Sequence, residues 1–183
     1  PTAIGSDDAV PVGRRDASML RRLGPTDVQV MHPRTPAEAD TPENLALLAQ
    51  ATGIWFTGGR QWRLMDSFEG TRAHELMREV LRRGGAVSGS SAGASIQAGY
   101  LVRGHPLGNT VMMAEGYERG LDFLPGVAVD QHFTQRNRRP DLLEVKRTFP
   151  QLLCLGIDEG TVLVVRGSTM EVIGDGTATV FDE

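Results

Sequence analysis

The feature of this sequence best suited to catalysis is a serine with a glycine two residues away on each side. The segment Gly89-Ser90-Ser91-Ala92-Gly93 has the pattern Gly-x-Ser-x-Gly, which presents a nucleophilic serine on a sharp turn between a strand and a helix. The glycines leave room for neighbouring chain, and the amides at the start of the following helix can bind an oxyanion. The pattern therefore indicates a nucleophile at Ser91. The alternative is a loop rich in serine and glycine whose serines only cap a helix.

A serine nucleophile needs a histidine base and a carboxylate that orients it. Of the four histidines, His132 follows an apolar segment at 126–129 that we predict to be a strand. The carboxyl end of a strand is where α/β proteins place functional groups. Asp158 and Glu159 follow another predicted strand, 152–157, and either one is a candidate for the acid. Taken alone, each of these residues is more often structural, since carboxylates commonly close turns.

An alternation of strands and helices must position these side chains. Apolar spacing and turn residues predict strands over 28–31, 54–57, 86–89, 126–129, 152–157, 162–165, 171–173 and 177–181, and helices over 41–53, 71–83, 92–99 and 140–149. We predict a loop over residues 5–16, which are polar and rich in turn formers, and we place His74 on the exposed side of its helix. The alternation indicates an α/β fold with a mostly parallel sheet between helices and antiparallel strands near the C-terminus.

Composition bounds the class of protein. The chain has 183 residues, of which 40% are hydrophobic and 23% charged, and this fits one globular domain over residues 1–183. A net charge of −4 argues against nucleic acid as a partner, and no apolar run approaches the roughly 20 residues that span a bilayer. The single cysteine, Cys154, excludes an internal disulfide and a cysteine-based metal cluster. It favours a reducing, cytoplasmic setting.

Five motifs, taken together and in this order, resemble the peptidase E and cyanophycinase family of serine peptidases. They are Phe56-Thr57-Gly58-Gly59-Arg60-Gln61, Gly89-Ser90-Ser91-Ala92-Gly93-Ala94, Leu124-Pro125-Gly126, Asp130-Gln131-His132-Phe133 and Gly156-Ile157-Asp158-Glu159. The resemblance implies a three-layer α/β sandwich similar to class I glutamine amidotransferases, and a homodimer. It also implies a triad in the order Ser91, His132, Glu159, which needs no metal or organic cofactor. As a hypothesis, the amides of Ala92 and Gly59 form the oxyanion hole.

The run Asp-Gln-His-Phe, followed by clustered arginines, is similar to the cyanophycinase branch of that family. Members of this branch cut cyanophycin, a poly-aspartate chain bearing arginine on its β-carboxyls, into β-aspartyl-arginine dipeptides. Such a substrate calls for both signs of charge, and arginines bind carboxylates as planar forks. The candidate substrate-binding residues are Gln61, Asp130, Gln131, Arg136, Arg138 and Arg139. The alternative for the arginines is a solvated basic stretch before a helix.

The chain departs from the family pattern at three places. Ser90 stands where threonine is usual, and Arg60 replaces the aspartate of Gly-Gly-Asp-Gln, which alters the charge near the expected cleft. The chain also begins where the family's first strand should already have ended. We expect either that this strand precedes the given sequence or that the protein is a trimmed form with an incomplete sheet. Two other functions stay open. One is a peptidase E-like dipeptidase that cleaves Asp-X or isoaspartyl bonds, and the other is an inactive relative that binds acidic peptides.

Overall fold

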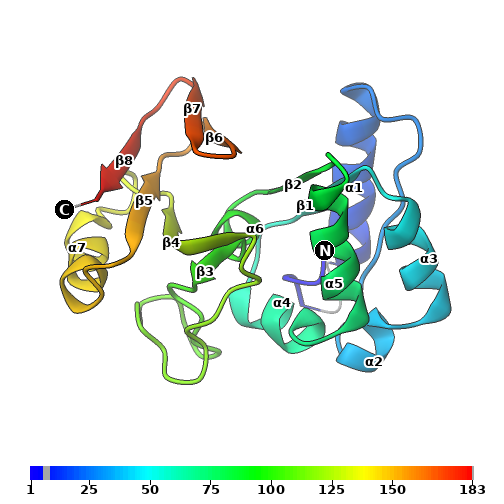
Figure 1. Ribbon diagram of the computed structural model, residues 1–183, viewed down its shortest axis with the longest axis horizontal. Coiled ribbons are helices and arrows are strands. Elements are labelled where there is room, and N and C mark those ends of the chain that lie inside the picture. Colours follow the sequence, from blue (N-terminus) through cyan, green and yellow to red (C-terminus); the bar gives the residue numbers. More distant parts are fainter. Residues whose placement is uncertain (6–8, 183) are drawn as a thin grey trace. The chain divides into compact units, whose positions relative to one another are not determined.

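The protein is described by a computed structural model that covers residues 1–5 and 9–182 (Figure 1). The chain divides into two compact units, Pro1–Gly93 and Ala94–Glu183. The boundary follows directly on the glycine-flanked serine motif. A single domain over residues 1–183 stays a prediction.

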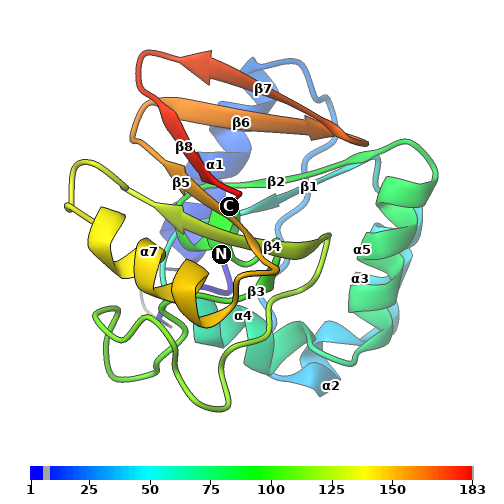
Figure 2. The same ribbon diagram turned by 60° about the vertical axis from the view of Figure 1, so that its left-hand side comes forward.

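The first unit is built around two parallel strands. Strand β1 (Gly53–Phe56) pairs with β2 (Ala86–Gly89), and Gly53 lies opposite Ala86. The helices of this unit are α1 (Ala9–Arg22), α2 (Pro36–Ala39), α3 (Pro42–Gln50), α4 (Gln61–Phe68) and α5 (Arg72–Arg82). Helix α3 packs along α5, and α5 contacts β2 (Figure 2). The carboxyl ends of both strands therefore point toward the loops that carry the Gly58-Gly59 turn and Ser91.

Local sequence explains where the main helices of this unit begin. The hydroxyl oxygens of Thr41 and Thr71 accept hydrogen bonds from the amides of Asn44 and His74, three residues on, as N-cap residues do. These bonds confirm the predicted starts of both helices. The expected exposure of His74 is wrong, however, because its side chain is 8% exposed.

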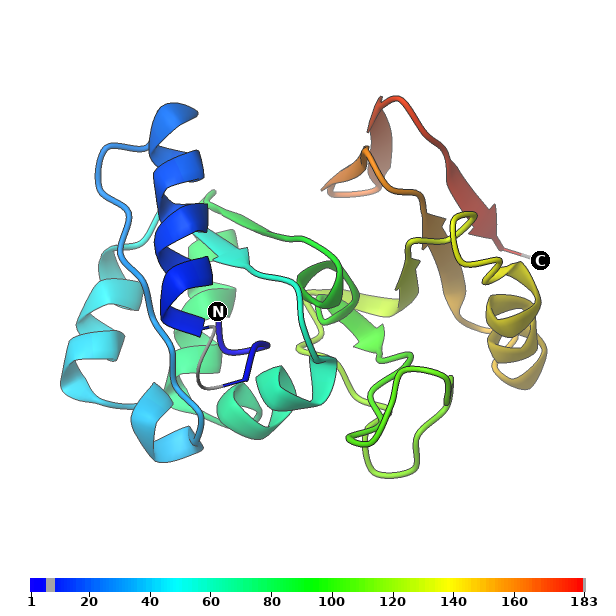
Figure 3. The same ribbon diagram turned by 180° about the vertical axis from the view of Figure 1, so that it is seen from behind.

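Two predictions about the N-terminal region are corrected. Residues 9–16, expected in a loop, belong to helix α1, while residues 6–8 of that segment lie outside the described residues. The helix is supported by a tertiary contact, since Trp55 Nε1 of β1 donates to the Asp16 carboxylate at 3.4 Å (Figure 3 shows α1 in front). Residues 28–31, expected as a strand, are not assigned to one, and Val30 is 44% exposed.

The second unit contains a four-stranded sheet in the order β3-β4-β5-β8. Its elements are α6 (Ala92–Ser95, which begins in the first unit), β3 (Ala98–Tyr100), β4 (Leu124–Gln131), α7 (Arg139–Thr148), β5 (Leu153–Ile157), β6 (Thr161–Arg166), β7 (Thr169–Gly174) and β8 (Ala178–Phe181). Strands β3, β4 and β5 are parallel, β8 is antiparallel at the edge, and β6 and β7 form a separate antiparallel pair. This arrangement confirms the predicted α/β class with antiparallel strands near the C-terminus. The helix predicted over 92–99 ends at Ser95, because the chain turns into β3.

The core of the second unit lies between the sheet and α7. Phe133, Leu142, Val145 and Cys154 are buried together with Phe181 of β8. Cys154 thus packs in the core as a small apolar side chain, and burial raises the pKa of its thiol. Among the described residues, none of the helices has the length and apolar content that a membrane span requires.

Candidate active site

The turn that carries Ser91 has the strained geometry of a presented nucleophile. Strand β2 ends at Gly89 and α6 begins at Ala92, and between them Ser91 has a φ of 55°. This left-handed conformation is uncommon for any residue with a side chain, and strain of this kind clusters at functional sites. A methyl group on Gly89 would overlap the backbone of Gly93, and one on Gly93 would overlap the backbone of Phe56. Both glycines of the motif are therefore required by packing.

The Gly58-Gly59 turn approaches Ser91 within the same unit. A Cβ atom placed on Gly58 would lie 3.2 Å from the Cβ atom of Ser91 and 3.8 Å from its Oγ. Gly59 has a φ of 141°, which side chains rarely adopt, and a Cβ there would overlap the carbonyl of Ala3. The predicted oxyanion residues Gly59 and Ala92 thus belong to the same unit as the predicted nucleophile.

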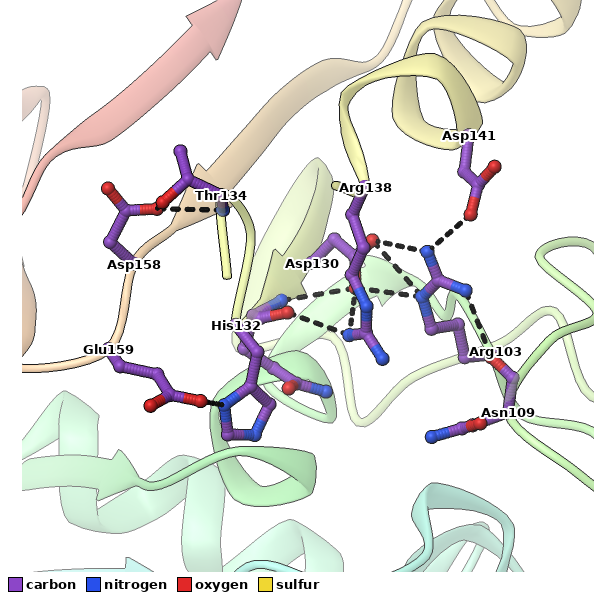
Figure 4. A network of polar contacts seen from close by, with 10 residues as sticks. Arg103, Asn109, Asp130, His132, Thr134, Arg138, Asp141, Asp158 and Glu159 are labelled. Atoms are coloured by element: carbon purple, nitrogen blue, oxygen red, sulfur yellow. Dashed lines mark hydrogen bonds and ion pairs between the residues drawn. The ribbon is translucent and has the colours of Figure 1, made fainter. Parts of the chain in front are cut away.

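His132 and Glu159 form a hydrogen-bonded pair in the second unit. The parallel register of β4 and β5 pairs Gln131 with Ile157, so the residues that follow these strands emerge at the same edge of the sheet. The Nδ1 atom of His132 lies 2.6 Å from Oε1 of Glu159 (Figure 4). The side chains of His132 and Glu159 are 22% and 54% exposed, so the pair is reachable from solvent. This is the geometry of a base and the acid that orients it.

Asp158, the other candidate acid, is engaged elsewhere. Its Oδ1 atom accepts hydrogen bonds from the backbone amide and the hydroxyl of Thr134 at 2.9 and 2.8 Å. Its Oδ2 atom accepts from the amide and hydroxyl of Thr177 at 3.2 and 2.7 Å. Burial alone would raise the pKa of Asp158, but these bonds to Thr134 and Thr177 lower the pKa below its ordinary value. Asp158 is therefore held ionised as an acceptor for two threonines.

A buried ion network lies just before His132 on β4. Asp130 is 0% exposed and accepts from Nη2 of Arg103 at 3.0 Å and from Nη1 of Arg138 at 2.8 Å (Figure 4). Arg138 also donates to the carbonyl of Gln131 at 2.7 Å, and Arg103 also pairs with Asp141 at 2.8 Å. Asp130 and Arg138 were predicted to contact substrate. Both are instead buried, and both form ion pairs or hydrogen bonds inside the protein. Charged groups removed from water need such partners, which is the physical reason for the network.

Arg103 was missed by sequence reasoning. It stands in a loop rich in glycine and proline, and no local pattern marks it, since its partners lie 27 and 38 residues further along the chain. Burial opposes its charge, but the hydrogen bonds and ion pairs with Asp130 and Asp141 raise its pKa above the ordinary value. Its φ of 58° is left-handed, like that of Ser91.

Of the other residues predicted to bind substrate, two are exposed and two are buried. Arg136 and Arg139 are exposed, and the guanidinium of Arg139 lies 5.0 Å from the ring centroid of Phe181. Gln131 is buried at the end of β4, and Gln61 is buried at the start of α4 in the first unit. Within residues 1–5 and 9–182, no group of three or more histidine, cysteine or acidic side chains is arranged to hold a metal ion.

A left-handed serine on a glycine-flanked strand–helix turn, and a histidine–carboxylate pair at strand ends, are typical of hydrolytic enzymes that use a serine nucleophile. Comparison with known proteins narrows this class. Peptidase family S51 matches residues 1–173, and the chain belongs to this family of peptidases. The predicted resemblance is thereby confirmed.

The relatives of the chain include curated cyanophycinases. The sequence is 33% identical to the cyanophycinase of Geminocystis herdmanii over 174 residues, which covers 93% of this chain and 64% of that protein. It is 32% identical to the cyanophycinase of Trichormus variabilis over 178 residues, covering 93% of this chain and 58% of that protein. The chain therefore spans less than two thirds of the length of these relatives. It also resembles the crystal structure of a peptidase from an acI-B1 Actinobacterium, with a TM-score of 0.77 and 25% identity over 97% of this chain and 73% of that one.

Proposed function

We propose that the protein is a serine peptidase that hydrolyses cyanophycin to β-aspartyl-arginine dipeptides. The observation that carries the proposal is the 2.6 Å hydrogen bond between His132 and Glu159, in a chain whose relatives include cyanophycinases. The strained conformation of Ser91 supports its role as the nucleophile. A homodimer and a cytoplasmic setting remain predictions.

In the proposed mechanism, Glu159 orients the imidazole of His132 through Nδ1 and stabilises its charged form. Nε2 accepts the proton of Ser91, and the serine oxygen attacks the scissile carbonyl. The amides of Ala92 and Gly59 stabilise the oxyanion, and a single donor of this kind contributes about 10²–10³-fold in rate. His132 then protonates the leaving amine, and water hydrolyses the acyl-enzyme with His132 again as the base.

The charged substrate is bound by the exposed arginines in this proposal. Arg136 and Arg139 are available to bind carboxylates of the aspartate backbone as planar donors. Gln61 and Gln131 supply neutral polar contacts. For Asp130 and Arg138 we propose support of the strand end before His132 in place of direct contact, since both are buried and ion-paired.

The nucleophile is tested by replacing Ser91→Ala and measuring release of β-aspartyl-arginine from cyanophycin. Loss of the attacking oxygen is expected to lower kcat by at least about 10³-fold, while the far-ultraviolet circular dichroism is unchanged. Ser95→Ala is a matched control in the same segment, because the buried Ser95 hydroxyl has no hydrogen-bond partner among the described residues, so its removal is expected to leave the turn intact. Unchanged turnover by the Ser91 variant would exclude this serine.

A second substrate and a covalent probe separate the proposal from its rivals. A dipeptidase of the peptidase E type would cleave a short Asp-X or isoaspartyl peptide in preference to cyanophycin. An inactive relative would cleave neither and would not react with a fluorophosphonate, which labels activated serines. We expect cleavage of cyanophycin and labelling that Ser91→Ala abolishes.

A further inference from the structure

His132 occupies a backbone conformation that needs support from its surroundings. Its φ of 51° lies in the left-handed region, and such strain persists only where neighbouring contacts determine the chain on both sides. The amide of Phe133 donates to the carbonyl of Ile157 at 3.1 Å, and the amide of Arg136 donates to the carbonyl of His132 at 3.0 Å. The first hydrogen bond joins the loop after β4 to β5, and the second forms a turn within that loop.

Two side chains, those of Asp158 and Gln135, form further hydrogen bonds between this loop and the loop that carries Glu159. Oδ1 of Asp158 accepts the amide and hydroxyl of Thr134, at 2.9 and 2.8 Å (Figure 4). In the opposite direction, the amide of Glu159 donates to Oε1 of Gln135 at 3.1 Å. The hydrogen bond between His132 and Glu159 is therefore accompanied by hydrogen bonds at Thr134 and Gln135, two and three residues after the histidine.

We propose that Asp158 is a positioning residue, which joins the loop of His132 to the loop of Glu159 and thereby sets the geometry of their hydrogen bond. The inference rests on the proposed function of this pair. Asp158 precedes Glu159 directly, and Thr134 is two residues after His132, so any shift in the Thr134–Asp158 contact displaces both members of the pair. The four hydrogen bonds to its carboxylate also lower the pKa of Asp158, which keeps it an acceptor.

The two threonines bound to Asp158 offer a matched test. Thr134→Val and Thr177→Val each remove one hydroxyl that donates to this carboxylate, at 2.8 and 2.7 Å, and keep the shape of the side chain. Only Thr134 lies on the loop of His132, whereas Thr177 precedes β8. We expect Thr134→Val to lower kcat on cyanophycin about 10-fold to 100-fold with KM changed less than about threefold, because misplacing a catalytic group acts on the reacting step.

Thr177→Val should leave kcat within about threefold of the unaltered protein, since its effect falls on folding stability. Thr134→Ser, which keeps the hydroxyl, should restore most of the kcat lost in Thr134→Val. If Thr134→Val does not fold, the serine variant and Thr134→Ala provide the same comparison. Equal kcat for the two valine variants, or a loss that serine does not restore, would overturn the proposal.

A readout that needs no substrate separates this inference from the proposed function. The proton shared by His132 Nδ1 and Glu159 gives a low-field proton NMR signal when the hydrogen bond is short. We expect this signal in the unaltered protein and in Thr177→Val, and its loss or broadening in Thr134→Val. Persistence of the signal in Thr134→Val would overturn the positioning role. Absence of cyanophycin cleavage by every variant, with these NMR differences present, would instead reject the proposed substrate.

Discussion

Two adjacent carboxylates, Asp158 and Glu159, have different tasks because their surroundings differ. Asp158 is surrounded by hydroxyl and amide donors, whereas Glu159 is 54% exposed and has an imidazole nitrogen 2.6 Å away. In the proposed mechanism, the carboxylate of Glu159 orients the base and compensates its charge during the reaction. The roles of the two residues are therefore assigned by their partners and not by their chemical type.

Glu159→Gln tests this assignment at the scale of a single residue. The amide keeps the size of the side chain but cannot compensate an imidazolium, so kcat on cyanophycin should fall by about 10²–10⁴-fold. Glu144→Gln is the matched control, because Glu144 is 60% exposed on α7 and pairs with the exposed Arg147 at 3.8 Å. A Glu159 variant with the activity of the control would show that this carboxylate does not assist the base.

At the scale of elements, one buried arginine connects three parts of the second unit. Arg103 donates to the carbonyl of Asn109 in its own loop at 2.9 Å, to Asp130 on β4 and to Asp141 on α7. Arg138 approaches the same carboxylate from the start of α7. The end of β4 that precedes His132 is thus held between a loop and a helix.

Arg103→Met should destabilise the protein strongly, because it leaves Asp130 in the interior with one cation in place of two. Breaking a buried ion pair by removing one partner costs about 3–5 kcal/mol. Arg147→Met removes an exposed arginine of α7, whose side chain is 73% exposed, and should change stability by less than about 1 kcal/mol. Urea unfolding followed by circular dichroism measures both variants, and equal stabilities would contradict a structural role for the network.

For the molecule as a whole, the hydrogen bonds to Asp158 predict how stability depends on pH. Burial acts to raise the pKa of Asp158, but its bonds to threonine lower the pKa below the value of 3.8 expected in the unfolded chain. The unfolded chain therefore binds this proton more readily than the folded one. The stabilisation is complete above the unfolded pKa and is lost as the pH falls through the lowered, folded pKa.

Asp158→Asn isolates that contribution. The free energy of unfolding of the unaltered protein should exceed that of the variant most at neutral pH, and the difference should shrink below about pH 4. Urea unfolding at a series of pH values provides the measurement. A difference that does not vary with pH would mean that the charge of Asp158 has no part in stability.

The sequence by itself determined the features that depend on neighbouring residues. Threonine caps start α3 and α5, because the hydroxyl bonds an amide three residues on. The glycine-flanked turn at Ser91 was also predictable, because the Gly-x-Ser-x-Gly pattern is local and Gly89 makes its close approach to Gly93 within the motif. The alternation of elements indicated the α/β class and the antiparallel C-terminal strands for the same reason: their periodicity is local.

Only the tertiary structure decided which partner each polar side chain finds. Residues 9–16 are polar enough to predict a loop, but they form a helix that contacts β1 through Trp55. The burial of Asp130 and the role of Arg103 follow from segments 27 residues apart that meet in the fold. From the residues alone, Asp158 and Glu159 were equivalent, and the family resemblance pointed to Glu159. In the fold, Asp158 is bound by Thr134 and Thr177, and Glu159 reaches His132. These contacts join distant segments and leave no local pattern in the sequence.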